Sequence, residues 1–149
     1  MPAKGGPGWV LAQGRNRARR MALQALYQWQ IARQDLSEIE TQFLVGPGVE
    51  QVDVTYFREL IHEIPAVNDT LQEAVDPLLD RPMVQLDPVE RAILWIGAYE
   101  LLHRPDIPYK VVINEGVDLA KTFGADQGHK FVNGVLDRLA RVIRSREAG

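Results

Sequence analysis

Apolar residues recur every three or four positions along most of the chain, which is the period of an α-helix that buries one face. No stretch alternates apolar and polar residues with the period of two that marks a half-buried strand. The first predicted helix runs from about Asn16 to about Gln34. Its apolar residues are Ala18, Ala22, Leu26 and Trp29 in one stripe, with Leu23, Tyr27 and Ile31 beside it. The pattern predicts an all-α fold.

Capping residues and a glycine-rich break define the next two predicted helices. Ser37 and Glu40 have the spacing of an S-x-x-E capping box, in which a hydroxyl and a carboxylate satisfy the first backbone N–H groups. We expect a short helix there, before Gly46-Pro47-Gly48 interrupts the chain. Asp53 is the predicted N-cap of a third helix. The apolar residues of these two helices are Ile39, Phe43, Leu44, Tyr56, Phe57, Leu60, Ile61 and Ile64.

Prolines mark the next boundaries. Pro65 is predicted to open a fourth helix, which Pro77 should kink or shorten because proline removes a backbone hydrogen bond. Asp87-Pro88-Val89-Glu90 is the strongest start signal in the chain, with an N-cap aspartate followed by proline in the first turn. The helix that it opens, Ala92 to Leu102, has Glu100 as its only charged residue, so we expect it in the centre of the fold.

Two more helices and an N-terminal segment complete the prediction. Pro108 opens and Gly124 closes the sixth helix, and the seventh runs from about Gln127 to Arg146. Residues 1–14 are predicted to be a flexible tail, because a segment rich in glycine and proline loses much conformational entropy on ordering. Residues 15–149 then form about seven helices around one core.

The composition places the chain among single-domain proteins of a reducing compartment. At 149 residues it can bury a sizeable core, and it has no cysteine for disulfides or thiolate metal sites. No apolar run approaches the roughly 20 residues of a membrane span, and Met1 to Gly14 lack the apolar segment of a secretory signal. We expect a cytoplasmic protein that does not bind membranes.

The charge is strongly polarised along the chain. Residues 1–34 hold six basic and no acidic residues, a net +6. Residues 35–100 hold three basic and fourteen acidic residues, and residues 101–149 hold eight and six, giving −11 and +2. The total is −3, but a protein with this distribution can present a positive face to phosphate while repelling it elsewhere.

The motifs of common enzymes are absent. The chain has no Gly-rich phosphate loop, no H-E-x-x-H and no G-x-S-x-G. His62, His103 and His129 lie far apart in sequence without the spacing of metal ligands, and the carboxylates are scattered. We predict a binding protein that is not an enzyme and uses no metal or cofactor.

Four arginines, Arg15, Arg17, Arg19 and Arg20, open the first predicted helix. A solvated helix end is the ordinary explanation of such a run, but two facts favour an anionic partner. Arginine at a helix N-terminus meets the positive end of the helix dipole. The first 34 residues also contain no carboxylate that could pair with these side chains. We predict that all four project outward and bind phosphate, which the planar guanidinium suits.

Aromatic residues near this basic run are candidates for stacking on the bases of single-stranded RNA. Tyr27 follows the arginines on the same helix, while Phe123 and Phe131 flank the turn at Gly124. Phe131 is next to Lys130, which favours partial exposure. Ordinary core packing remains an alternative for each aromatic residue.

Several separated segments, taken in order, resemble the NusB family of bacterial transcription antitermination factors. These are Arg17–Tyr27, Val52–Phe57, Val89–Leu94 with Tyr99–Leu101, Tyr109–Gly124 and His129–Asp137. The resemblance covers about residues 15 to 145. It implies two helical subdomains around a shared core and a first helix that binds the boxA element of nascent ribosomal RNA. It also implies a partner, the ribosomal protein NusE, and an antitermination complex on RNA polymerase.

The resemblance further implies roles for individual residues. Glu90 matches a carboxylate on the partner-binding side, where a basic ribosomal protein would dock, and the acidic middle of the chain agrees with that role. The residues that match the RNA-binding surface are Arg15, Arg17, Arg19, Arg20, Tyr27, Phe123, Gln127, Lys130 and Phe131.

Two other functions remain open. The chain could be a protein–protein adaptor whose basic helix docks on an acidic protein without direct RNA specificity. It could also be an RNA-binding domain related to that of ribosomal RNA methyltransferases, although no cofactor-binding domain follows in this sequence.

Overall fold

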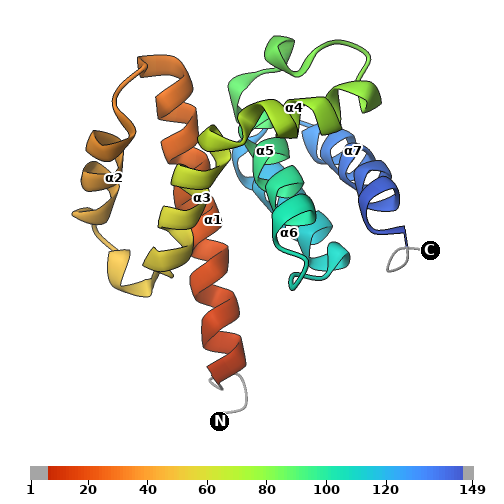
Figure 1. The fold of residues 1–149 in the computed structure, drawn as a ribbon. Coiled ribbons are helices and arrows are strands. Elements are labelled where there is room, and N and C mark those ends of the chain that lie inside the picture. Colours follow the sequence, from red (N-terminus) through yellow and green to blue (C-terminus); the bar gives the residue numbers. More distant parts are fainter. Residues whose placement is uncertain (1–6, 146–149) are drawn as a thin grey trace. The chain divides into compact units, whose positions relative to one another are not determined.

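A computed structural model describes residues 7–145 (Figure 1). Over these residues the chain forms seven α-helices and no strand, so the all-α prediction is confirmed. The chain divides into two compact units, Met1–Pro65 and Ala66–Gly149, in agreement with two helical subdomains. The first unit contains α1 (Pro7–Ala32), α2 (Leu36–Leu44), the short 3₁₀ helix η2 (Val49–Gln51) and α3 (Val54–Ala66). The second contains α4 (Asn68–Val75), η3 (Asp76–Leu78), η4 (Met83–Gln85), α5 (Pro88–His103), α6 (Tyr109–Phe123) and α7 (Gly128–Ile143).

The first helix begins much earlier than the sequence predicts. It starts at Pro7 rather than Asn16, so residues 7–14 of the predicted flexible tail are helical, while residues 1–6 lie outside the described residues. Proline suits the first helical position because its φ is preset and its missing N–H would have no helical partner. Figure 1 shows the first turns of α1 extending beyond α2 and α3. At Gly14 the carbonyl accepts a hydrogen bond of 3.1 Å from the N–H of Asp53, which ties α1 to the start of α3.

The helix caps of the first unit are partly as predicted. Asp53 accepts a hydrogen bond from the N–H of Tyr56 at 3.0 Å, which confirms it as the cap of α3. The capping box at Ser37 is wrong, because α2 begins at Leu36 and Asp35 is the N-cap that accepts from the Ser37 N–H at 3.2 Å. The backbone of Asp35 is extended while that of Ser37 is already helical, so only Asp35 can occupy the N-cap position.

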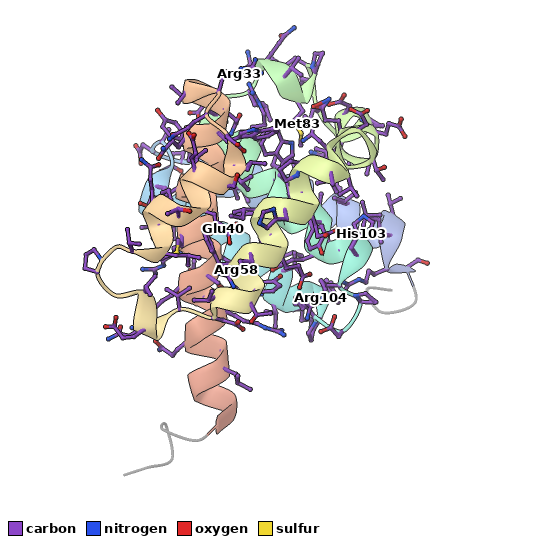
Figure 2. The ribbon with its side chains drawn as sticks, turned by 60° about the vertical axis from the view of Figure 1, so that its left-hand side comes forward. Arg33, Glu40, Arg58, Met83, His103 and Arg104 are labelled. Atoms are coloured by element: carbon purple, nitrogen blue, oxygen red, sulfur yellow. The ribbon has the colours of Figure 1, made fainter. Side chains whose placement is uncertain are left out.

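Glu40 joins two helices instead of capping one. Its carboxylate accepts from the Arg58 Nε at 2.7 Å and lies 2.7 Å from the His62 Nε2, both on α3. Figure 2 shows Glu40 and Arg58 close together. Burial alone would raise the pKa of Glu40, but hydrogen bonds from His62 and Arg58 outweigh it and hold the pKa below 4.5. The carboxylate therefore stabilises the contact between α2 and α3 at neutral pH.

The boundaries of the second unit follow the local signals more closely. Pro65 does not open α4, which begins at Asn68; it lies in the last turn of α3, where its missing N–H removes a single helical hydrogen bond. Pro77 ends the α-helical hydrogen bonding as predicted, since α4 stops at Val75 and continues as η3. Asp87 is confirmed as the N-cap of α5, accepting from the N–H groups of Val89 and Glu90 at 2.7 and 3.2 Å.

The core of the second unit is built on α5. Every residue from Ala92 to Leu101 is buried, as the nearly uncharged sequence of this helix predicts. Both α6 and α7 pack against it. Gly97 of α5 and Gly116 of α6 allow this close approach, because a Cβ on either would lie 2.6 Å from a methyl group of Leu136 on α7.

Candidate nucleic-acid interface

The arginines of α1 divide between two faces of the helix. The side chains of Arg17 and Arg20 are exposed and have no hydrogen bond or ion pair with any other described residue. Arg15 is half-buried, with its Nε 3.9 Å from a carboxylate oxygen of Asp53 and its guanidinium 5.0 Å from the centre of the Tyr56 ring. The predicted outward, unpaired arrangement therefore describes Arg17 and Arg20 only.

Arg19 corrects the sequence prediction most clearly. Its side chain is only 3% exposed, and its guanidinium lies 5.5 Å from the centre of the same Tyr56 ring. Residues four positions apart occupy one face of a helix, so Arg15 and Arg19 both face α3. The sequence contained a signal for this, since Arg19 precedes the buried Leu23 by four positions and Leu26 by seven. Arg19 stabilises the first unit rather than offering a charge to a ligand.

The exposed side chains of α1 form a continuous stripe. Its members lie at spacings of three, four and three residues, which places them on one helix face. We call the set the α1 stripe; its residues are Arg17, Arg20, Gln24 and Tyr27, all exposed. Tyr27 is 42% exposed, so its ring is accessible and the alternative of core packing is wrong for this residue. The stripe places two guanidinium groups and an aromatic ring in line, the combination that holds single-stranded nucleic acid. The sequence prediction missed Gln24, although the same helical spacing identifies it.

The other predicted RNA-binding residues lie in the second unit, around the turn between α6 and α7. Gln127 and Lys130 are exposed, while Phe123 and Phe131 are half-buried, between the two alternatives that the sequence left open. Gln127 has a φ of 66°, a left-handed conformation that is uncommon outside glycine and that places it as the N-cap of α7.

Glu90 lies in the first turn of α5 and comes close to the start of α7. Its Oε2 is 3.3 Å from the point where a Cβ on Gly128 would be, so glycine at this position leaves room for the carboxylate. Glu90, Arg81 and Phe131 line the same surface depression. Burial and the neighbouring Asp87 raise the pKa of Glu90 above its ordinary value of 4.5, and Arg81 opposes this shift. The structure thus brings together two residues, Glu90 and Phe131, that the sequence assigned to different ligands.

The part of the chain that the structure describes has neither a candidate metal cluster nor a helix that could cross a membrane. Across residues 7–145, no group of three or more His, Cys, Asp and Glu side chains could hold a metal ion. None of the helices over those residues combines the length and the apolar character that crossing a membrane requires.

Comparisons with known proteins agree on one family. The sequence model of the NusB family matches residues 16–141. The chain is 53% identical over 133 residues to the transcription antitermination protein NusB of Pseudomonas entomophila (strain L48), covering 89% of this chain and 80% of the relative. It is 47% identical over 146 residues to the protein of the same name from Marinobacter nauticus, covering 98% and 92%. A solved structure of T. maritima NusB superimposes with a TM-score of 0.77 at 30% identity, over 89% of this chain and 94% of that one.

Proposed function

Because this chain belongs to the NusB family, we propose that it is a non-enzymatic transcription antitermination factor that binds boxA RNA together with NusE. The family relationship supports the antitermination role. The resemblance to the family implies boxA RNA and NusE as partners, and residues on the surface of each unit support this proposal. The bound pair would then join the antitermination complex on RNA polymerase.

The observation that carries the RNA-binding proposal is the α1 stripe. Arg17 and Arg20 have no counter-charge among the described residues, so a phosphate can approach them without displacing a carboxylate. Tyr27 lies seven residues beyond Arg20 on the same face and can stack on a base. We propose a second set of RNA contacts in the other unit, made by Lys130, Gln127, Phe123 and Phe131.

We expect the double variant Arg17→Gln/Arg20→Gln to bind boxA RNA more weakly and with a smaller dependence on salt. Each phosphate of a single strand that the variant no longer binds reduces the slope of log affinity against log salt by about 0.7, so two phosphates reduce it by about 1.4. Fluorescence anisotropy at several salt concentrations measures this slope, and circular dichroism checks the helical content.

A charge-matched control separates the two stripe arginines from a general effect of positive charge. Arg33→Gln, matched to the single variant Arg17→Gln, removes one positive charge from the same unit outside the α1 stripe and should leave the slope unchanged. Equal slopes for wild type and a folded Arg17→Gln/Arg20→Gln variant would remove the stripe from RNA binding.

The adaptor alternative makes a different prediction for RNA binding. If the chain only joins proteins, boxA RNA is retained on a filter when NusE is present and not when this chain is alone. A methyltransferase-related function would require methyl transfer from S-adenosylmethionine to RNA, which we expect to be absent.

We propose Glu90 as a contact for NusE, and we expect Glu90→Gln to weaken that complex by about tenfold.

A cation of the partner beside this carboxylate favours its ionised form. Since the pKa of Glu90 in the free chain is above 4.5, affinity for NusE should rise as the pH increases through that raised pKa and then level off. Isothermal titration calorimetry between pH 4.5 and 7.5 tests this, with Glu73→Gln, an exposed carboxylate of α4, as the control. An identical pH dependence in wild type and Glu90→Gln would exclude Glu90 from the interface.

A further inference from the structure

A depression of about 390 Å³ lies beside the α1 stripe, between α1 and the chain that connects α2 to α3. Figure 1 shows this connection, which includes η2, running beside the middle of α1. The volume is within the range of roughly 300–1,000 Å³ that is usual for small-molecule sites. The side chains that matter for its chemistry are Arg17, Arg20, Gln24, Gln42, Phe43 and Gln51.

The charges around this depression favour an anionic ligand. Among the described residues, no Asp or Glu lines it, and two of the α1 arginines do. The neighbouring groove, which shares Arg17 and Gln51 with it, is lined in addition by Glu50 and Asp53. A phosphate would be repelled by those two carboxylates, so an RNA strand that follows the α1 stripe should use the depression and not the groove.

Three glutamine amides supply both donors and acceptors. Gln42 uses its Oε1 to accept from the Nε2 of Gln28 at 2.7 Å, which leaves its NH₂ group as a donor. Gln24 uses its Nε2 on the carbonyl of Arg20 at 3.3 Å, which leaves its Oε1 as an acceptor. The Gln51 side chain has no hydrogen bond with another described residue and can do either.

A half-buried aromatic residue forms one wall of the depression. Phe43 packs toward the interior of the first unit, with its ring centre 6.3 Å from that of Phe57. This contact orients the ring, and Phe43 is also one of the residues that line the depression. Proteins hold an unstacked base of single-stranded RNA by combining an aromatic side chain with hydrogen-bonding groups, and both kinds of residue line this depression.

We propose that this depression receives one unstacked nucleobase of the RNA strand, read by Gln24, Gln42 and Gln51 while Arg17 and Arg20 hold the adjoining phosphates. The inference rests on the proposed function and extends it, because it assigns sequence discrimination to side chains that have no charge. The α1 arginines then determine the salt dependence of binding, and the glutamines determine the preference for a base.

RNAs that each lack one base show which base, if any, the depression receives. A series of boxA RNAs, each with one abasic nucleotide, is titrated against the wild-type chain and against Gln24→Leu/Gln51→Leu, which removes two amides at nearly constant volume. For wild type, one abasic position should lower affinity by about tenfold. For the variant, an abasic nucleotide at this position should lower affinity no more than one at any other position. The slope of log affinity against log salt with intact RNA should be the same as for wild type.

Two glutamines outside the depression provide the control. Gln13→Leu/Gln85→Leu replaces two glutamines outside the depression and should retain the wild-type profile. A folded Gln24→Leu/Gln51→Leu variant with the full wild-type profile overturns the base site and leaves RNA binding by the α1 stripe intact. Failure of the wild-type chain to bind any RNA of the series, with or without NusE, overturns both.

Discussion

Replacing Arg144 by alanine is expected to lower the free energy of unfolding by about 3–5 kcal/mol, with the loss concentrated in the second unit. The side chain is 8% exposed at the end of α7 and donates to four carbonyls at the C-terminal end of α5 and in the following loop. The acceptors are the carbonyls of Leu101 at 3.2 Å, Ile107 at 2.5 Å, Glu100 at 2.9 Å and Arg104 at 2.9 Å.

The size of this effect follows from what alanine would leave behind. The last carbonyls of a helix have no donor within the helix and carry the negative end of its dipole, so a buried guanidinium satisfies both their hydrogen bonding and their charge. Without it, the carbonyls of Leu101 and Ile107 lose their donor, whereas those of Glu100 and Arg104 keep the backbone N–H groups of Arg104 and Ile107. A decrease of this size is a large part of the 5–15 kcal/mol that usually stabilises a domain.

Two variants show whether the buried geometry is responsible. Arg141→Ala changes an arginine three residues earlier whose side chain is 66% exposed and pairs with Asp137 at 3.1 Å, so we expect a loss of at most about 0.5 kcal/mol. Arg144→Lys keeps the charge, but one ammonium cannot reach four separated carbonyls, and stability should remain well below wild type. Urea unfolding and amide hydrogen exchange of α5 measure the change in stability. An Arg144→Ala variant as stable as Arg141→Ala would contradict the assignment.

Leu136→Ala is expected to lower the free energy of unfolding by about 2–5 kcal/mol, because the side chain fills a space that its neighbours cannot close. Leu136 is fully buried on α7, between Gly97 and Gly116. Its two methyl groups lie 2.6 Å from the points where side chains on these glycines would begin. Truncation therefore leaves a cavity against bare helix backbone. The measurement is the denaturant midpoint, with the m-value checked for a change in the unfolding transition.

A second substitution tests whether Gly116 and Leu136 share one space. Gly116→Ala alone should lower the free energy of unfolding by about 1–3 kcal/mol, because the added methyl group overpacks against Leu136. In the Leu136→Ala background the added methyl group enters the cavity, so its cost should disappear and the two changes should couple by about 0.5–3 kcal/mol. Gly134→Ala is the control, because no atom lies within 4 Å of its added Cβ, and it should stabilise α7 by about 0.5–1 kcal/mol. Additive effects of Gly116→Ala and Leu136→Ala would show that the two residues do not share one space.

Most helix ends of this protein can be predicted because their signals are local. Asp53, Pro77 and Asp87 each act on backbone groups within three residues, and each has the predicted effect. The wrong boundaries depend on more than local signals. Asp35 and Ser37 are both good caps, and only the backbone conformation selects between them. The early start of α1 is accompanied by a bond to Asp53, which lies 39 residues beyond Gly14 in the sequence.

The helical fold class, the basic first helix and the resemblance to the NusB family could all be read from the sequence, because periodicity, charge and motif order are properties of neighbouring residues. Which cations reach solvent depends instead on how the helices pack. The packing of α3 against one face of α1 places Arg15 and Arg19 beside Tyr56 and leaves Arg17 and Arg20 in line with Tyr27. Folding also brings the end of α5 to Arg144, more than 30 residues away in the chain, and so makes one arginine of a basic C-terminal segment part of the core. Whether an arginine is buried depends on which helices pack against it, and the residues next to it in the sequence do not determine that packing.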